Sequence, residues 1–497
     1  MDLIETFLEH NGPALSSEIA KHLVDAHRMT PDQARKRVSR ASHVRRLSGV
    51  TFPHRVRFLY LDRQFGSGRY WANLASALIS SGSAYGYAIN ALRQRDGIVP
   101  ERHFPIICGA PVRQQKHLSP EKIFQRLSEA GLLKRVTLPK IGECISLARV
   151  DEMYDWREAD FRARLMAEEI LLSAVKDWLR NLGIASYNQV ATREGDTLPQ
   201  VATFVWDMTA PSYLGHMVKK TQDGQVKPGF VACDVYLGSV VTEDGVGPFV
   251  RKCITLRSLR NVGPCMQIFV GPRFTDGAFR LLKQHGIIPA TPRSLFGEEV
   301  ADGLVQLQSV LSSAAKTTVD PERFDKLFKQ LGKIEGAANQ LRGTLFEYLT
   351  AELSRQSRAQ TVKMNRIFKP SGDNEEAEAD VVAVHNDKIR VIECKGYSPR
   401  GTVPIDLFKR WLQVNVPRCY RAIKEHPDWR NLPVHFEFWC SGKLSEEALD
   451  LFHAAQKSLN ANRYSIDLRI GRELHDAFRE NKDAGLLTAF EKHFLSH

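Results

Sequence analysis

Residues 380–395 restrict the possible folds of this chain more than any other stretch. Two apolar runs rich in β-branched residues, 381–384 and 389–392, flank the polar segment 385–388, which contains Asn-Asp. Two such runs around a short polar segment predict an antiparallel β-hairpin. Because side chains alternate along a strand, the second run presents one face that we expect to point inward.

An acid and a base follow the second run on that inward face. Glu393 and Lys395 are two positions apart, so their side chains project on the same side of the strand. Burying either charge alone is costly, and Asp380, at the start of the paired strand, is placed to approach both. Hard carboxylate oxygens suit Mg²⁺, which polarises a phosphate and activates water. The backbone carbonyl of Cys394 faces the right way to be a further ligand, and the lysine would orient the water or stabilise charge on the phosphoryl oxygens.

The spacing D-x12-E-C-K across residues 380–395 resembles the PD-(D/E)xK, or restriction-endonuclease-like, nuclease superfamily. The resemblance implies a core of helix, hairpin, strand, helix and strand, with Mg²⁺ as cofactor and Mn²⁺ as a substitute. It also implies an acid on the first helix, which Glu347 matches, and a polar residue beside the site, for which Gln413 on the predicted helix 404–424 is the candidate. The implied metal ligands are Asp380, Glu393, Glu347 and the Cys394 backbone carbonyl.

An E-x-K triplet alone is weak, because surface strands and helices contain it constantly. The alternative here is a solvated edge hairpin with a surface ion pair, and for Gln413 it is a solvated helix face. The apolar strand before the triplet, the aspartate at hairpin distance and the upstream helix carrying Glu347 favour the nuclease interpretation.

The basic residues are concentrated at the N-terminal end. Residues 1–140 contain 22 Lys and Arg against 11 Asp and Glu, whereas the formal net charge of the whole chain of 497 residues is +12. The remainder is therefore nearly neutral, and this asymmetry predicts an N-terminal part that binds a polyanion. The alternative, a general solubility charge, would not need to lie at one end.

Composition also excludes several classes of protein. No run approaches the roughly 18 apolar residues that suggest a membrane span, and the first residues lack the basic and apolar regions of an export signal. The eight cysteines include no Cys-x-x-Cys pair, which argues against a zinc ribbon or a disulfide scaffold. We therefore expect no membrane partner and a reducing, cytoplasmic compartment.

Residues 1–65 have the pattern of a winged helix-turn-helix domain. Thr30-Pro31-Asp32 is a strong helix start, with a cap, a proline at the first helical position and an acid at the positive end. The helix that follows, 33–42, is basic, and residues 50–61 look like the wing hairpin. Such a helix enters the major groove in these modules; a protein-binding winged helix is the alternative. The predicted nucleic-acid contacts are Arg35, Lys36, Arg37, Arg40, Arg45 and Arg46.

The middle of the chain repeats part of its C-terminal region. Residues 268–281 align without a gap to residues 438–451, at a constant offset of 170, with matching helix-cap, acidic and apolar positions. If the repeat is real, Asp207 replaces the first aspartate of the C-terminal site, and Asp234-Val-Tyr236 replaces its E-C-K triplet. Tyrosine cannot supply an ammonium group, so this copy is predicted to be a degenerate nuclease fold. An unrelated α/β domain is the alternative.

Together these patterns predict a multidomain α+β and α/β protein, with N-terminal winged helices followed by two restriction-endonuclease-like units, each a mixed sheet flanked by helices. The predicted domains are a winged helix (1–65), a second winged-helix-like domain (66–155), the degenerate unit (156–300), a helical connector (301–342) and the nuclease domain (343–497).

The predicted function is that of a metal-dependent endonuclease recruited to nucleic acid by the winged helices. Double-stranded DNA is favoured and RNA is not excluded, and phage defence or restriction is the setting by analogy alone. The competing function is that of a non-catalytic DNA-binding regulator or assembly subunit. A homodimer and a defence-system partner protein both stay open.

Overall fold

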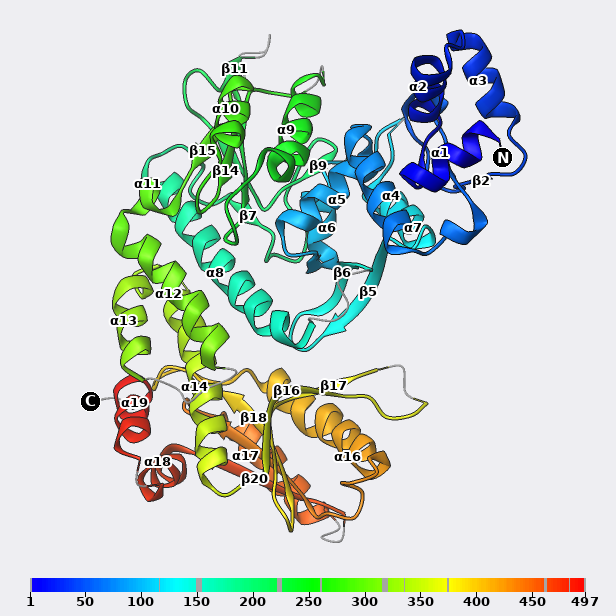
Figure 1. Ribbon diagram of the computed structural model, residues 1–497. Helices are drawn as coiled ribbons and strands as arrows, with labels where there is room; N and C mark the ends of the chain where they lie inside the picture. The colour runs from blue at the N-terminus through cyan, green and yellow to red at the C-terminus, as the bar shows by residue number, and fades with distance from the viewer. Residues whose placement is uncertain are drawn as a thin grey trace. The chain divides into compact units, whose positions relative to one another are not determined.

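The chain divides into two units by its internal contacts. The first unit comprises Met1–Thr137, Glu143–Asp155 and Val175–Leu295, and the second comprises Leu138–Gly142, Trp156–Ala174 and Phe296–His497. The five predicted domains are finer than this division. Each unit contains helices and a mixed five-stranded sheet (Figure 1). The computed structural model describes residues 2–115, 117–148, 154–220, 226–259, 262–314, 321–334, 336–372, 375–459, 463–481 and 483–495.

None of the helices in the described part of the chain is both long and apolar enough to cross a lipid bilayer.

The first unit begins with three helices and a small antiparallel sheet of order β1-β3-β2. The basic helix begins where the sequence predicts, because Thr30 Oγ1 accepts the N–H of Gln33 and Pro31 is the first helical residue. The predicted wing hairpin over 50–61 is only partly strand, and its first strand lies earlier, since Pro53 opens a 3₁₀ turn. The elements are α1 Leu3–Asn11, β1 Ala14–Leu15, α2 Ser16–His27, α3 Pro31–Arg40, β2 Arg45–Arg46, the 3₁₀ turns Pro53–Arg55 and Asp62–Gln64, and β3 Phe58–Tyr60.

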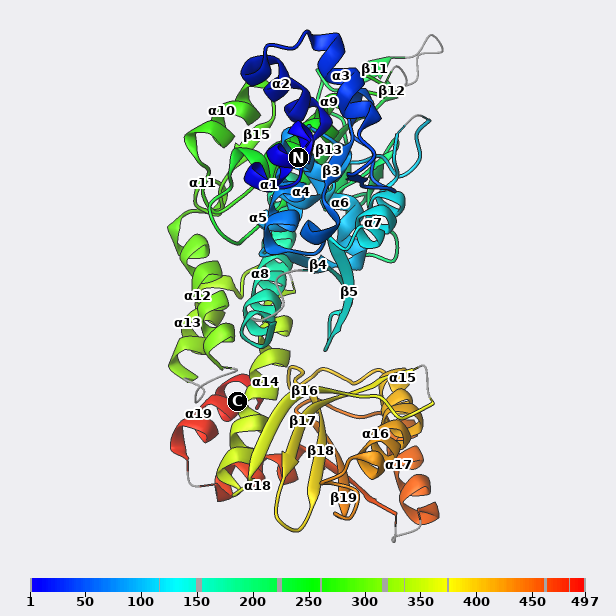
Figure 2. The same ribbon diagram turned by 45° about the vertical axis from the view of Figure 1, so that its right-hand side comes forward.

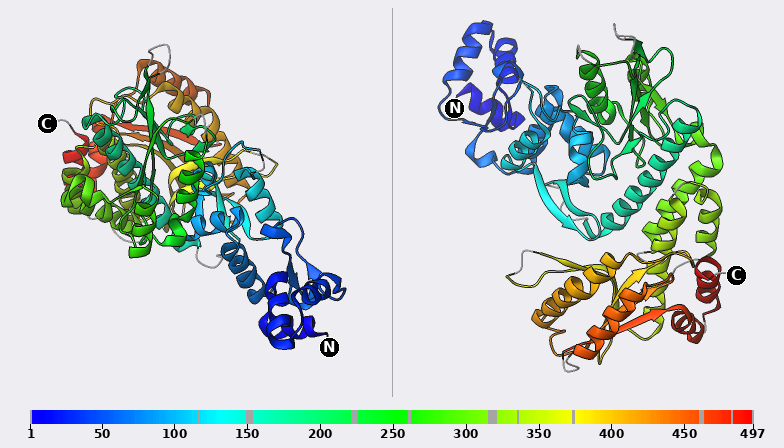
Figure 3. Two further views of the ribbon diagram at one scale, coloured as in Figure 1. Left: turned by 90° about the horizontal axis from the view of Figure 1, so that it is seen from above. Right: turned by 180° about the vertical axis from the view of Figure 1, so that it is seen from behind.

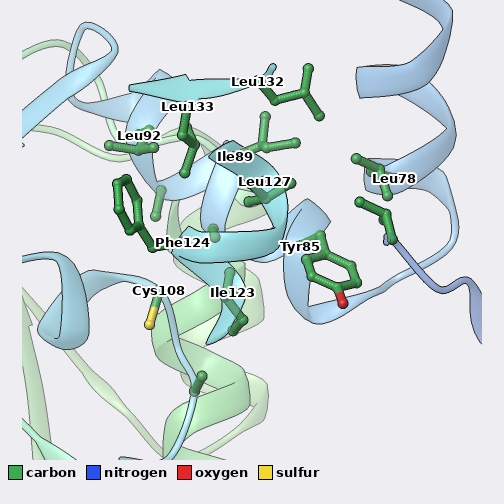
Figure 4. Packing of buried hydrophobic residues seen from close by; sticks show 14 of the residues in the cluster. Leu78, Tyr85, Ile89, Leu92, Cys108, Ile123, Phe124, Leu127, Leu132 and Leu133 are labelled. Atoms are coloured by element: carbon green, nitrogen blue, oxygen red, sulfur yellow. The ribbon is translucent and has the colours of Figure 1, made fainter. Parts of the chain in front are cut away.

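The next part repeats this strand order, with a sheet of order β4-β6-β5. In its core, α5 packs against α4 and α7, and Ile89, Leu127 and Leu133 belong to one hydrophobic cluster (Figure 4). The sequence predicts a wing-like hairpin of residues 132–138 and 143–150 here; residues 149 and 150 lie outside the described residues. The elements are α4 Gly68–Ser80, α5 Ala84–Gln94, β4 Ile98–Pro100, the 3₁₀ turn Glu101–His103, α6 Phe104–Ile107, α7 Pro120–Glu129, β5 Leu133–Leu138 and β6 Gly142–Leu147.

The long helix α8, Tyr154–Asn181, leads into the sheet of the middle region, whose order is β15-β14-β13-β10-β7. The sequence predicts a strand over 204–207; the structure has the short strand β9 Phe204–Val205 there, and the strand that joins the five-stranded sheet, β10, begins at Met208. The elements are β7 Ala191–Thr192, β8 Gln200–Val201, β9 Phe204–Val205, β10 Met208–Ser212, β11 Lys219–Lys220, β12 Val226–Lys227, β13 Gly229–Val235, α9 Glu243–Arg257, β14 Cys265–Val270, α10 Asp276–Gln284, β15 Ile288–Ala290 and α11 Pro292–Phe296.

The second unit has a sheet of order β16-β17-β18-β19-β20, with α14 on one face and α15 to α17 on the other (Figures 2 and 3). The sequence does not predict strand β16, and α14 begins within the predicted connector. The elements are α12 Glu298–Ala314, α13 Pro321–Leu331, α14 Ala337–Gln356, β16 Thr361–Phe368, β17 Ala377–Val384, β18 Ile389–Lys395, α15 Ile405–Arg410, the π-helical turn Trp411–Asn415, α16 Val416–Glu425, β19 Val434–Cys440, α17 Glu446–Ser458, β20 Ser465–Ile470, α18 Gly471–Glu480 and α19 Ala484–Phe494.

The two five-stranded sheets have the same order and the same strand directions, as the repeat predicts. In each, the first three strands pair antiparallel and the last two pairings are parallel. The helix caps match at the predicted offset, because Thr275 caps α10 and Ser445 caps α17 by the same bond. The strand pairing corrects the gapless alignment. Asp234 lies opposite Phe269 and Glu393 lies opposite Phe438, so the strands that contain these phenylalanines are offset by 169 residues and not by 170. The C-terminal copy therefore has one extra residue between this strand and the helix that follows.

The predicted helix 404–424 is interrupted in the middle. A π-helical turn, Trp411–Asn415, separates α15 from α16. Pro417, near the start of α16, has no N–H to donate to the carbonyl four residues earlier, and a local π turn is one way in which a helix accommodates this loss.

Candidate functional site

The hairpin predicted around residues 385–388 is present. Strands β17 and β18 pair up to Val384 opposite Ile389, and the N–H of His385 donates to the carbonyl of Lys388 at 2.8 Å. The sequence predicts that Asp380 lies at the start of its strand. It is instead the fourth residue of β17, because the strand extends back to Ala377.

The three residues of the predicted catalytic pattern lie together. Asp380 Oδ2 accepts the backbone N–H of Cys394 at 2.7 Å, which fixes the carboxylate against the neighbouring strand. Lys395 Nζ lies 2.6 Å from Glu393 Oε1 and 3.6 Å from Asp380 Oδ2. The backbone bond and the ammonium therefore hold two carboxylates and a lysine in one cluster.

Glu347, on α14, reaches this cluster through a cation that the sequence did not reveal. Lys140 Nζ lies 2.5 Å from Glu347 Oε1 and 2.8 Å from Asp380 Oδ1. Lys140 lies in the turn Leu138–Gly142 between β5 and β6, and these five residues belong to the second unit. No local pattern could have predicted this contact, because it joins residues far apart in the sequence.

Glu378 is a further acidic residue at this place. The backbone N–H of Lys140 donates to Glu378 Oε2 at 3.1 Å, while Glu378 Oε1 is buried and has no hydrogen-bond partner among the described atoms. The sequence favours a solvated acidic loop that includes Glu378, with the alternative that one acid of this loop assists the metal. Instead Glu378 lies in β17, two residues before Asp380.

Burial and the two ammonium groups set the protonation of the cluster in opposite directions. Burial alone would raise the pKa of Asp380, but Lys140, Lys395 and the Cys394 N–H outweigh it and lower the pKa to about 2. Burial and the Asp380 charge raise the pKa of Glu393 to about 7, although Lys395 opposes them. Burial also raises the pKa of Glu347 against the effect of Lys140. The cluster therefore holds more carboxyl groups than its two lysines neutralise.

The side chains of the cluster supply the oxygen ligands that Mg²⁺ prefers. Within the described ranges, no group of three or more His, Cys, Asp or Glu side chains is already arranged around a metal position. The Lys140 ammonium instead pairs with one oxygen each of Glu347 and Asp380. These two carboxylates converge on one cation, so the donor set fits a metal ion that takes the place of this ammonium.

The middle sheet holds its acids in the same backbone geometry. Asp207 Oδ2 accepts the N–H of Val235 at 2.8 Å, as Asp380 accepts that of Cys394. The strand register agrees as well. The residue after Asp207 pairs with the residue before Asp234, and the residue after Asp380 pairs with the residue before Glu393. Tyr236, in the place of the lysine, is buried, and its hydroxyl accepts the N–H of Ser239 at 2.8 Å.

The acids of the middle sheet are neutralised from within. Arg193 Nη1 lies 3.0 Å from Asp207 Oδ1, and Lys252 Nζ lies 2.6 Å from Asp234 Oδ2. The Lys252 ammonium also donates to the carbonyl oxygens of Ile106 and Val205 at 3.1 and 3.0 Å. The Lys252 and Asp234 side chains are only 1% and 4% exposed, so this cluster is closed to ions and substrates.

The N-terminal part of the first unit carries a groove of about 890 Å³ between α2, α3 and the loop before β3. Arg35, Lys36 and Arg40, three of the predicted contacts, are exposed on α3. The basic side chains that line the groove are Lys21, Arg35, Arg46, His54, Arg55 and Arg57.

The other three predicted contacts have partners within their own domain. Arg37 and Arg45 each pair with an aspartate, at 2.8 and 2.7 Å. Arg46 Nη2 donates to the carbonyl oxygens of Ser39 and Ala41, at 3.0 and 2.9 Å, at a helix end where such carbonyls need donors. Arg46 therefore stabilises the end of α3 as well as lining the groove.

Gln413 is exposed on the π-helical turn, and its place beside the site stays a prediction, as does the metal-binding role of the Cys394 carbonyl. Comparison with known proteins finds no match: no protein-family model, no curated protein and no solved structure is significantly similar to this chain.

Proposed function

We propose that this protein is a Mg²⁺-dependent endonuclease, with the cluster of Asp380, Glu393, Lys395 and Glu347 as its active site. One observation carries the proposal: two carboxylates from separate elements, Glu347 and Asp380, converge on a single cation beside Lys395. Surface ion pairs do not need such convergence. The same strand order in the two sheets supports the repeat, and with it the proposal that the two units share one fold.

The residues of the site divide the chemistry between them. Asp380, Glu393 and Glu347 would hold the metal, with Mn²⁺ as a substitute, and a bound metal would polarise the phosphate and activate water. Asp380 is kept ionised by its neighbours, so it is ready to bind a cation at neutral pH. Lys395 places a positive charge where the phosphoryl oxygens gain negative charge in the transition state.

The same proposal is tested directly by cleavage in the presence of different metals. Plasmid DNA, linear duplex DNA, single-stranded DNA and RNA are each incubated with the full chain and Mg²⁺, Mn²⁺ or Ca²⁺. We expect Mg²⁺ and Mn²⁺ to support cleavage, and Ca²⁺ to bind without supporting it. Cleavage should disappear in an Asp380→Asn variant. A folded wild-type protein that binds DNA and cleaves none of these substrates with any metal would favour the non-catalytic DNA-binding regulator.

We further propose that the first N-terminal domain, taken as a winged helix, binds the nucleic acid through the exposed basic face of α3 and the adjoining groove, with duplex DNA favoured. A triple variant, Arg35→Ala, Lys36→Ala and Arg40→Ala, should bind duplex DNA more weakly. For every phosphate that the variant no longer neutralises, the slope of log affinity against log salt should fall by roughly 0.9. Fluorescence anisotropy at several salt concentrations measures that slope.

Arg37→Ala is the matched control for the triple variant, because it removes a cation of the same helix that is already paired with Asp2. We expect a smaller change in slope for this variant than for any one of the three exposed cations. An unchanged slope in the triple variant would place the binding surface elsewhere.

A further inference from the structure

The tip of the β5–β6 hairpin occupies the position that the proposed active site needs for its metal. The Lys140 ammonium pairs with Glu347 Oε1 and Asp380 Oδ1. The backbone N–H of the same residue donates a hydrogen bond to Glu378 Oε2. One residue therefore engages three carboxylates. Its side chain remains 26% exposed, so the ammonium is not locked in as Lys252 is in the middle sheet.

The backbone of this turn is unusual for a lysine. The N–H of Ile141 donates to the carbonyl of Leu138 at 3.3 Å, with Pro139 second and Lys140 third in the turn. Lys140 has φ of +59°. A proline followed by a residue with positive φ is the pattern of a tight turn that normally takes glycine or asparagine at the third position. The turn would therefore form more easily without the lysine.

We propose that Lys140 is a tethered competitor for the divalent cation, and that the hairpin tip must withdraw before the site can be loaded. This inference rests on the function proposed above and adds its regulation. An ammonium and a divalent cation cannot share the same two oxygens, because their like charges repel at this distance. If a site is open for only a fraction of the time, its apparent affinity for the ligand is its intrinsic affinity multiplied by that fraction.

The test measures metal binding without substrate. Mn²⁺ binding to the full chain is followed by electron paramagnetic resonance of the free ion, for wild type, Lys140→Asn and Lys140→Gly. Both substitutions remove the ammonium and suit the positive φ, so the turn should form in each. We expect Mn²⁺ to bind at least about ten-fold more tightly to both variants than to wild type.

Arg358→Asn is the matched control. Arg358 also has positive φ, at +64°, and is an exposed cation of the second unit after α14. This control should leave Mn²⁺ affinity unchanged. Adding Asp380→Asn to Lys140→Asn should abolish the tightened binding. Equal affinity in wild type and both Lys140 variants, or no Mn²⁺ binding in any of them, would overturn the proposal, as would tight binding that survives Asp380→Asn.

A second readout follows the tip itself. Withdrawal breaks the bond from the Lys140 N–H to Glu378, so Mn²⁺ should speed hydrogen exchange of the tip amides in wild type. Unchanged exchange at saturating Mn²⁺ would contradict withdrawal. Tightened Mn²⁺ binding without any cleavage would refute the endonuclease while leaving the competition intact. Cleavage with equal Mn²⁺ affinities would support the endonuclease and refute the competition.

Discussion

A Lys395→Met variant is expected to cleave nucleic acid about 10²–10³-fold more slowly than wild type, the usual cost of losing one donor aimed at developing charge. The Lys395 ammonium lies 2.6 Å from Glu393 and 3.6 Å from Asp380, beside the carboxylates that would hold the metal. Methionine keeps much of the side-chain volume, so folding and DNA binding should persist. Single-turnover cleavage at saturating Mn²⁺ measures the effect.

Lys443→Met is the control for this experiment, because Lys443 is an exposed lysine of the same unit. It should cleave at the wild-type rate. If Lys395→Met folds, binds DNA and also cleaves at the wild-type rate, the chemistry takes place elsewhere and the site is wrong.

A Lys252→Met variant is expected to lower the free energy of unfolding of the first unit by about 3–5 kcal/mol, the usual cost of leaving a buried charge without its partner. The Lys252 ammonium satisfies Asp234 and the carbonyl oxygens of Ile106 and Val205. Methionine fills a similar volume but donates no hydrogen bond. Hydrogen exchange of β10 and β13 peptides in increasing urea measures the decrease in stability.

Two further variants separate the effect of removing a buried lysine from the effect of leaving the Asp234 charge unpaired. Lys283→Met removes an exposed lysine of α10 in the same unit and should change stability by less than about 0.5 kcal/mol. Adding Asp234→Asn to Lys252→Met removes the orphaned charge and should recover part of the stability. A Lys252→Met protein as stable as wild type would show that the buried pair does not hold the middle sheet together. Cleavage should be unaffected by Asp234→Asn, because that sheet is closed.

The hairpin and the strand order could be predicted because their signals are local. The apolar runs on either side of residues 385–388 determine the pairing, and strict alternation places Glu393 beside Lys395. The repeat was visible because Thr275 and Ser445 open their helices with the same cap. The offset within the strands was wrong by one residue, since sequence similarity alone does not reveal a short insertion in a loop.

Lys140 and Lys252 could not be predicted, for two different reasons. Lys140 contacts Glu378 across a separation of 238 residues, so no window of the sequence contains both partners. Lys252 lies on α9, a helix with Gly245, Gly247 and Pro248 in its first two turns, which disfavour a helix by propensity. Tertiary packing overrides that propensity, because a Cβ at position 245 would overlap the side chain of Gln94.

The closed acidic cluster of the middle sheet has a consequence for how such a chain can change over generations. Losing Lys252 alone leaves Asp234 buried without its cation, and losing Asp234 alone leaves the ammonium without its carboxylate. Each single loss is penalised, because it leaves one buried charge without its partner. A cluster like that of Asp380, Glu393 and Lys395 would need Lys252 and Arg193 to be replaced and a lysine to be present at position 236. The two buried charges are therefore expected to be lost or kept together, because neither can be removed alone without leaving the other unpaired.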